Sequence, residues 1–238
     1  MAKVLLDMAV SIDGFVGGSD GEDVGLYDWY FNPSEMSRPV IEELIETTGA
    51  IVLGRGAYGT GEDSGGWDDT PYAVPHFVIT HRPPAPPPDR TVEFVFITDG
   101  IAAAVDAAKQ AAGDRYATIG GGADIARQAL ATGLVDELQL HVVPLLVGGG
   151  VRLFDRLDHG WQLTKIRVID GPIVTHLRYR VDGHERHCQA DLHGAGSRRS
   201  GDSPSIVETP SKPIVRSSSA TMFSMTCRTP SAPAIANP

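Results

Sequence analysis

The chain has 238 residues, of which 42% are hydrophobic and 21% charged, a balance typical of a globular protein with an apolar core. A formal net charge of −10 argues against nucleic acid as a partner, because nucleic-acid binding depends on clusters of Lys and Arg. The two cysteines, Cys188 and Cys227, lack the spacing of metal ligands, so we predict neither a metal site nor a disulfide framework.

The N-terminal residues run directly into a strand pattern, without the apolar stretch and cleavage site of a secretory signal. No segment of the sequence has the apolar length that is needed to cross a bilayer. We therefore expect a cytoplasmic protein with no membrane partner.

Strand-like and helix-like segments then alternate, which is typical of an α/β sheet with helices packed on it. The predicted strands are residues 4–10, 50–53, 76–79, 93–97 and 115–119, and the predicted helices are residues 39–47, 101–112 and 123–131. Thr98 and Asp99 precede the second helix and are expected to cap it. Gly133 is expected to end the third.

Three further strands are predicted at residues 137–143, 162–169 and 173–181, with Gly171 and Pro172 as the turn of a hairpin between the last two. The sheet is therefore expected to be mixed, mostly parallel at first and antiparallel at its C-terminal strands. From Gly183 onward Ser, Thr and Pro dominate, without an apolar period. We predict one domain over residues 1–182 and a disordered tail over residues 183–238.

A glycine run, Gly120-Gly121-Gly122, joins a predicted strand to a predicted helix. Backbone without Cβ atoms can approach a phosphate closely, and the following helix start, Ala123, Asp124 and Ile125, offers N–H donors. The run is also compatible with a tight turn that needs glycine for its own sake. Two other strand ends carry phosphate-binding groups, Gly54-Arg55 and Thr80-His81-Arg82. Groups at three strand ends favour a shared phosphate site.

Four segments together resemble the reductase domain of bacterial riboflavin biosynthesis, which shares the dihydrofolate reductase fold. They are Val-Ser-Ile-Asp-Gly-Phe at residues 10–15, Val-Leu-Gly-Arg-Gly-Ala-Tyr at 52–58, Ile-Gly-Gly-Gly at 119–122, and Leu-Val-Asp-Glu-Leu-Gln-Leu-His-Val-Val-Pro-Leu-Leu-Val-Gly-Gly-Gly at 134–150. The resemblance covers roughly residues 1–182. It implies a three-layer α/β fold with helices on both faces of a mixed sheet, and a homodimeric, NADPH-dependent reductase.

The resemblance also implies roles for single residues. The glycine loop and the helix start would bind the cofactor diphosphate, and the other two strand ends would face the adenosine 2′-phosphate. In dihydrofolate reductases the glycine pair of this loop contains a cis peptide. The cofactor-binding residues expected on this basis are Gly54, Arg55, Thr80, His81, Arg82, Gly120, Gly121, Gly122, Ala123, Asp124 and Ile125.

On the substrate side, the resemblance suggests Asp13 as the acid that orients ring N–H groups or assists proton delivery. An Asp-Gly turn explains the same residues without a site. The segment 144–150 either walls the substrate cavity or forms a strand-end turn at the dimer contact. The substrate-binding residues expected on this basis are Ser11, Asp13, Gly14, Leu145, Gly148 and Gly149.

Two departures narrow the function. The acid that dihydrofolate reductases place on their first long helix has no secure counterpart, because Glu35, Glu42 and Glu43 are interpreted as solvent-facing. Folate is therefore not the favoured substrate. The zinc signature of the deaminase half of riboflavin enzymes is absent. The aromatic residues Trp29, Tyr30, Phe31, Trp67 and Tyr72 are placed in loops beside the expected crevice. Stacking on a flat ring is one interpretation, and core or lid packing is the preferred one.

The predicted activity is hydride transfer from NADPH to a small pterin-like or pyrimidine-like heterocycle, with 5-amino-6-(5-phosphoribosylamino)uracil of riboflavin biosynthesis as one candidate. A non-catalytic nucleotide-binding protein of the same fold is one alternative, because a fold does not guarantee chemistry. A structural subunit whose glycines serve only turns is the other.

Overall fold

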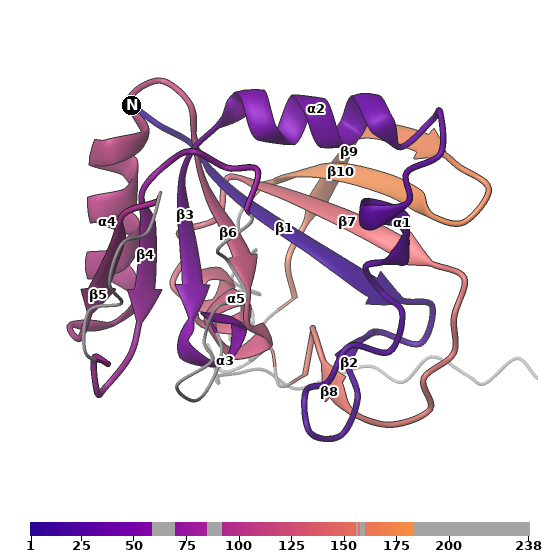
Figure 1. The fold of residues 1–238 in the computed structure, drawn as a ribbon, viewed down its shortest axis with the longest axis horizontal. Helices are drawn as coiled ribbons and strands as arrows, with labels where there is room; N and C mark the ends of the chain where they lie inside the picture. The colour runs from indigo at the N-terminus through magenta and orange to yellow at the C-terminus, as the bar shows by residue number, and fades with distance from the viewer. Residues whose placement is uncertain (59–69, 85–91, 156, 158–159, 183–238) are drawn as a thin grey trace, which may run out of the picture. The chain divides into compact units, whose positions relative to one another are not determined.

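An eight-stranded mixed sheet forms the centre of the computed structural model, which describes residues 1–58, 70–84, 92–155, 157 and 160–182 (Figure 1). The strand order is β5-β4-β3-β6-β1-β7-β10-β9. The strands of this sheet are β1 (Val4–Ser11), β3 (Thr48–Gly54), β4 (His76–Ile79), β5 (Phe94–Ile97), β6 (Tyr116–Gly121), β7 (Glu137–Val143), β9 (Leu163–Asp170) and β10 (Thr175–Val181).

The sheet is parallel from β5 to β7 and antiparallel at β10 and β9. The predicted mixed sheet is therefore confirmed, and Gly171 begins the turn of the β9–β10 hairpin, where its N–H donates to the Val174 carbonyl. β1 and β3 lie in the middle of the sheet and are buried along almost their whole length. This burial explains why both read as continuous apolar runs.

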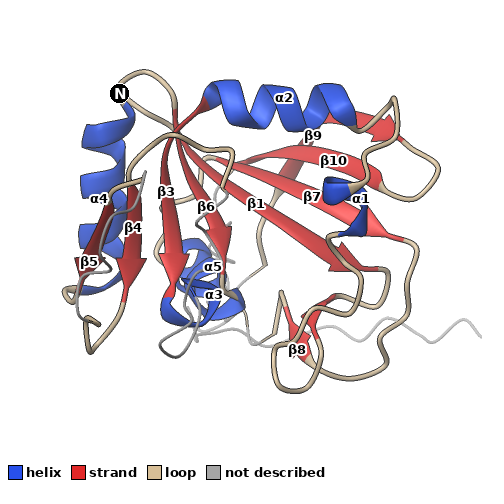
Figure 2. Cartoon of the chain, in the orientation of Figure 1, coloured by secondary structure: helices blue, strands red, loops and turns tan. Residues whose placement is uncertain are grey.

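Helices cover both faces of the sheet (Figure 2). The helices α4 (Gly100–Ala112) and α5 (Ala123–Ala131) place their apolar stripes against Leu6 and Val52, in the larger core. The helix α2 (Arg38–Thr47) packs Val40 and Leu44 against Leu5, whose side chain points to the opposite face. This gives the expected three-layer arrangement.

The helix ends test two predictions. Gly133 has φ of +69°, its N–H donates to the Leu130 carbonyl, and the Leu134 N–H donates to the Ala129 carbonyl, so the predicted helix stop is confirmed as a Schellman motif. The capping prediction for α4 is wrong. Asp99 occupies the N-cap position, but it has φ of −89° and ψ of 13° and makes no side-chain cap hydrogen bond, outside the extended conformation that such caps adopt.

Four short elements were not predicted: β2 (Phe15–Gly17), β8 (Val151–Arg152), α1 (Asp28–Phe31) and α3 (Arg55–Tyr58). β2 and β8 pair in a second, two-stranded sheet, and α1 contains three of the aromatic residues that the sequence placed in loops. Within the described part of the chain, no helix is long and apolar enough to span a membrane. Trp67 and the predicted tail over residues 183–238 lie outside the described residues, and the two-part division of the chain stays a prediction.

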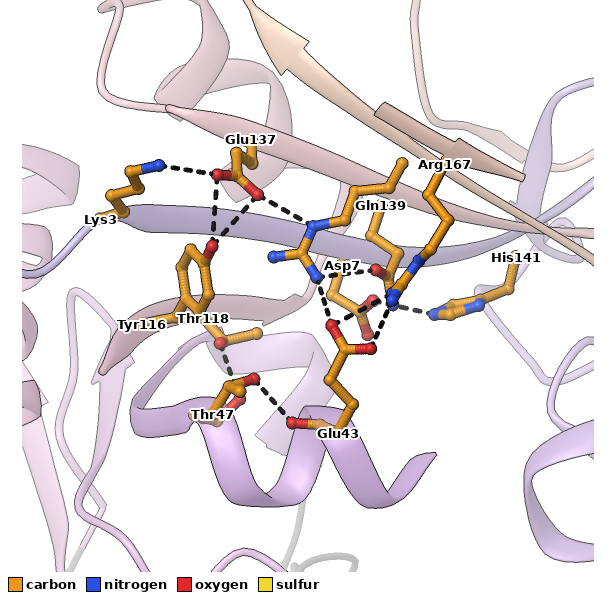
Figure 3. Close-up of polar contacts among 12 residues, drawn as sticks. Lys3, Asp7, Glu43, Thr47, Tyr116, Thr118, Glu137, Gln139, His141 and Arg167 are labelled. Carbon is orange, nitrogen blue, oxygen red and sulfur yellow. Dashed lines mark hydrogen bonds and ion pairs between the residues drawn. The ribbon is translucent and has the colours of Figure 1, made fainter. Parts of the chain in front are cut away.

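An ion-pair network fixes α2 on the sheet (Figure 3). Arg178 on β10 donates from Nε to Glu137 at 2.9 Å and from Nη1 to Glu43 on α2 at 3.0 Å. Arg167 on β9 also binds Glu43, at 2.6 Å and 3.1 Å. Burial acts to raise the pKa of Glu137, but the Lys3 hydrogen bond and the Arg178 charge lower it below its usual value. Glu43 is thus a half-buried ion-pair partner of two arginines on the sheet, and its assignment as a solvent-facing acid is wrong.

Candidate active site

Three strand ends form one side of a cleft of about 1760 Å³ at the carboxyl edge of the parallel strands. β4, β3 and β6 are adjacent and parallel, so the residues that follow them meet at the same edge of the sheet. The structure brings all the sequence-predicted cofactor residues to this cleft: Gly54, Arg55, Thr80, His81, Arg82, Gly120, Gly121, Gly122, Ala123, Asp124 and Ile125.

The three glycines of the loop differ in whether, and why, the structure requires glycine at their positions. Gly122 has φ of +95°, a conformation that side chains other than glycine rarely adopt. A Cβ atom at Gly121 would lie 2.7 Å from Ala57 Cβ, so this position needs glycine for packing. A Cβ atom at Gly120 would meet only Ile51 Cγ2, at 3.8 Å. Gly120 therefore has room for a side chain, and both Gly120 and Ile51 line the cleft. All peptide bonds of the described residues are trans, unlike the glycine pair of dihydrofolate reductases.

The N-terminus of α5 supplies hydrogen-bond donors to the cleft. Gly122 occupies the N-cap position, and no side chain caps the helix, so the N–H groups of its first turn are not used by a cap. Asp124 lies in this turn, but its carboxylate accepts from Gln128 Nε2 at 2.7 Å and lies 3.7 Å from Arg127. The helix start is thus suited to an anionic group.

Two cations of the cleft, Arg55 and Arg82, come from the ends of β3 and β4, and a third, Arg127, comes from α5. Arg55 is half-buried, with its guanidinium 5.3 Å from the Tyr58 ring centroid. Thr80 is buried, and its hydroxyl donates to the Arg82 carbonyl and accepts from the Arg82 N–H, both at 3.1 Å. Thr80 therefore shapes the turn that presents the exposed His81 and Arg82 side chains.

The other half of the cleft is lined by β1, α1 and β7. Trp29 is 3% exposed and stacks on His141, with the ring centroids 4.3 Å apart and an interplanar angle of 35°. Trp29 Nε1 has no hydrogen-bond partner among the described residues. Burial, with the nearby charge of Asp7, raises the pKa of Tyr27 to about 12. This half offers flat apolar surfaces and neutral O–H and N–H groups, which suit a planar ring.

Asp7 is the carboxylate that β1 contributes to this half of the cleft (Figure 3). Its side chain is 18% exposed, and Oδ1 lies 2.8 Å from Nε2 of the buried His141. Sequence reasoning missed both residues. Asp7 is the charged residue in the apolar run of β1, and His141 alternates with leucines in β7 together with Glu137 and Gln139. Such polar positions in central strands were the available signal, because a buried polar side chain requires a partner.

The predicted substrate residues gather at a different place. Asp13 accepts hydrogen bonds from Ser11 Oγ at 2.6 Å, the Val147 N–H at 3.1 Å and the Gly148 N–H at 2.7 Å, and so joins the turn after β1 to the segment 144–150. None of the six belongs to the described residues that line the cleft: Ser11, Asp13, Gly14, Leu145, Gly148 and Gly149. Their role in substrate binding stays a prediction, and the geometry gives Asp13 a structural task.

Asp13 leads to a testable pH dependence. The Ser11 hydrogen bond lowers the pKa of Asp13 to about 2 from an ordinary value of 3.8, with the two backbone N–H groups acting in the same direction. A lowered folded-state pKa gives stability that is present above the ordinary pKa and is lost as the pH falls toward 2. We expect Asp13→Asn to lower the urea midpoint at neutral pH, and this difference to vanish near pH 2. An equal difference in urea midpoint between wild type and Asp13→Asn at both pH values would contradict a stabilising role of the ionised Asp13 carboxylate.

Similar solved structures share this fold at low sequence identity. Dihydrofolate reductase from Enterococcus faecalis, complexed with NADP(H), is 15% identical with a TM-score of 0.51 over 76% of this chain and 96% of that one. The diaminohydroxyphosphoribosylaminopyrimidine deaminase/5-amino-6-(5-phosphoribosylamino)uracil reductase of Thermotoga maritima is 12% identical with a TM-score of 0.53 over 76% of this chain and 56% of that one. The chain is thus an α/β protein of the dihydrofolate reductase-like fold.

Residues 2–175 match the family model of the RibD C-terminal domain, and the chain belongs to that family. YwjB of Bacillus subtilis strain 168 is 25% identical over 171 residues, which cover 70% of this chain and 88% of YwjB. The sequence match thus gives the family of the chain, and the solved structures give its fold.

Proposed function

We propose that the protein is an NADPH-dependent reductase that transfers hydride to a small planar heterocycle of pterin-like or pyrimidine-like structure. The observation that carries this proposal is that all the cofactor residues expected from the sequence line one cleft, which continues to Asp7 and Trp29. A cofactor-binding half and an aromatic-lined half in one cavity favour a bound dinucleotide that reaches toward a second ligand.

The residues present fit NADPH. The uncapped start of α5 and the open space at Gly120 would hold the diphosphate, and the half-buried Arg55 with the exposed Arg82 would hold the 2′-phosphate. When bound, the cofactor supplies the hydride. The chain's own residues orient the two ligands, exclude water with the rings of Trp29 and Tyr30, and offer Asp7 as an ionisable group.

The proposed substrate class follows from the half of the cleft that is lined by the aromatic side chains of α1. The family favours a pyrimidine of riboflavin biosynthesis, and 5-amino-6-(5-phosphoribosylamino)uracil is the candidate that the T. maritima relative's name provides. The test is NADPH oxidation with a panel of pterins, flavin precursors and small carbonyl compounds. Turnover with a heterocycle supports the proposal, whereas NADPH binding without turnover across the panel supports the non-catalytic alternative.

Arg55 provides a test of cofactor preference. If its guanidinium binds the 2′-phosphate, Arg55→Ala should weaken NADPH binding about tenfold or more, since a charge-assisted hydrogen bond contributes about 1.5–3 kcal/mol. NADH lacks this phosphate, so its affinity should stay nearly constant. Fluorescence titrations of both nucleotides measure the two effects, and equal weakening would remove Arg55 from the 2′-phosphate site.

A homodimer in the cytoplasm is part of the same proposal. β9 lies at the edge of the sheet, and its side chains Leu163, Ile166 and Val168 are 41%, 51% and 47% exposed. Exposed apolar side chains on an edge strand favour contact with a second copy of the chain. Light scattering measures the mass in solution.

A further inference from the structure

A buried chain of hydrogen bonds leads away from the cleft at Asp7. Asp7 Oδ1 lies 2.8 Å from His141 Nε2, and His141 Nδ1 lies 2.6 Å from His176 Nδ1. His176 Nε2 then lies 3.1 Å from Ser37 Oγ, which lies 3.1 Å from Ser34 Oγ. His141, His176 and Ser37 are 1%, 3% and 0% exposed. The chain thus connects the cleft, through the interior, to the half-buried Ser34 before α2.

The hydrogens of this chain have one consistent direction when Asp7 is ionised and both rings are neutral. A carboxylate only accepts, so His141 carries its hydrogen on Nε2 and has a bare Nδ1. His176 must then donate from Nδ1, which leaves its Nε2 to accept from Ser37. Every hydrogen in the chain therefore points toward Asp7.

The surroundings keep His176 neutral. Burial and the neighbouring His141 lower the pKa of His176 to about 4, and Arg167 acts in the same direction, while Asp7 acts against it. These are the charged and titratable groups that face His176 from β7, β9 and β1. At neutral pH the His176 ring is therefore uncharged, as the single direction of the hydrogens requires.

Tyrosines face Asp7 from the other side. Burial is the main cause that raises the pKa of Tyr27, Tyr30 and Tyr72, and the charge of Asp7 adds to it in each case. These phenols stay protonated and add no charge. Asp124, another carboxylate of the cleft, is engaged by Gln128 and Arg127. Asp23, also in the cleft, accepts from the N–H groups of Gly25 and Leu26, and Asp20 is exposed. Among the described carboxylates of the cleft, Asp7 is the one bound to the buried histidines.

Resting on the proposed reduction, we propose that Asp7 is the acid–base residue of the cleft and that His141, His176 and Ser37 position it. Reduction of a C=N bond adds a hydride, with its electron pair, to carbon and a proton to nitrogen. The Asp7 carboxyl gives this proton, so its O–H bond breaks as the N–H bond of the product forms. It regains a proton from solvent through the cleft.

The buried chain stabilises the carboxylate that this step leaves behind. Loss of the proton turns a neutral carboxyl into an anion next to His141 Nε2. Because the hydrogens of His141, His176 and Ser37 already point toward Asp7, the new charge meets fixed donors and needs little reorganisation. His141 also borders the cleft, but its Nε2 is bound to Asp7. In this proposal His141, His176 and Ser37 act only through Asp7.

The first test is made on the full chain without NADPH or substrate. NMR of the histidine side-chain nitrogens should show His141 protonated on Nε2 and His176 on Nδ1 at neutral pH. Asp7→Asn removes a charge that favours the protonated form of His176, so the His176 ring should then titrate at lower pH. Asp106→Asn makes the same change at an exposed position of α4 and should shift neither ring. The opposite tautomers, or an unchanged titration in Asp7→Asn, would overturn the inferred hydrogen-bond chain from Asp7 to His176.

The second test measures turnover with the panel substrate that wild type reduces best. Asp7→Asn should lower kcat about 100-fold or more, the usual contribution of general acid catalysis, with the Kd for NADPH unchanged. Ser37→Ala should lower kcat without changing KM, and Ser37→Thr should restore it. Wild-type kcat in Asp7→Asn would overturn the acid–base role. Absence of NADPH binding in wild type would instead refute the proposed function. The NMR test would still show whether the hydrogen bonds from Asp7 to Ser37 have the inferred direction.

Discussion

Gly120→Val should weaken NADPH binding about 100-fold, because the loss of two charge-assisted hydrogen bonds to a phosphate costs about 3 kcal/mol. A Cβ atom at Gly120 meets nothing closer than Ile51 Cγ2 at 3.8 Å, so the fold can accept the side chain. The valine methyl groups would then occupy the cleft beside Ile51. Fluorescence titration measures the affinity, and thermal unfolding confirms that the fold is intact.

Gly121→Val is the matched comparison. Its Cβ atom would lie 2.7 Å from Ala57 Cβ and 3.3 Å from Leu53 Cδ2, so this substitution overpacks the interior. Overpacking costs about 1–3 kcal/mol, and Gly121→Val should therefore lower Tm, whereas Gly120→Val should not. If Gly120→Val binds NADPH as wild type does, the glycine loop serves only as a turn.

Arg178→Met should destabilise the protein by about 3 kcal/mol, which corresponds to a decrease in Tm of about 6–12 °C for a domain of this size. Arg178 and Glu137 are both 8% exposed in their side chains. Removal of the guanidinium leaves the Glu137 carboxylate buried with less compensation, removes the donor to Gln139 Oε1, and leaves Arg167 as the ion-pair partner of Glu43. Denaturant unfolding measures the change.

Lys3→Met supplies the control for this prediction. Lys3 binds the same Glu137 carboxylate at 3.0 Å, but its side chain is 62% exposed, and exposed ion pairs contribute about 0–1 kcal/mol. Glu137→Gln should reduce the cost of Arg178→Met, because the buried negative charge is then absent. Equal effects of Arg178→Met and Lys3→Met would contradict the importance of burial in this network.

The long elements could be predicted because their signals are local. β1 and β3 are central strands, buried on both faces, and this leaves continuous apolar runs in the sequence. Gly133 ends α5 through a motif of neighbouring residues. That the residues expected to bind a cofactor would lie in one cleft was also predictable, since parallel strands bring their carboxyl ends to one edge of the sheet. The local apolar pattern and the parallel direction of the strands were therefore sufficient to predict the long elements and the edge of the sheet at which the strand ends meet.

The remaining features depend on contacts between distant residues. β2 and β8 are three and two residues long and exist because Phe15 pairs with Arg152 across the small sheet. The Asp7–His141 contact joins residues 134 positions apart, and it requires the β1–β7 register, which no local pattern specifies. Asp13 was chosen from a motif, whereas Asp7 is recognised only when its neighbours are known.

Titration of the wild-type chain with NADPH, followed by nucleotide fluorescence, tests the central claim most directly. A cleft that holds the diphosphate at the glycine loop predicts saturable binding with one site per chain, lost in Gly120→Val and weakened in Arg55→Ala. A linear signal without saturation in wild type would contradict the assignment of this cleft as a cofactor site.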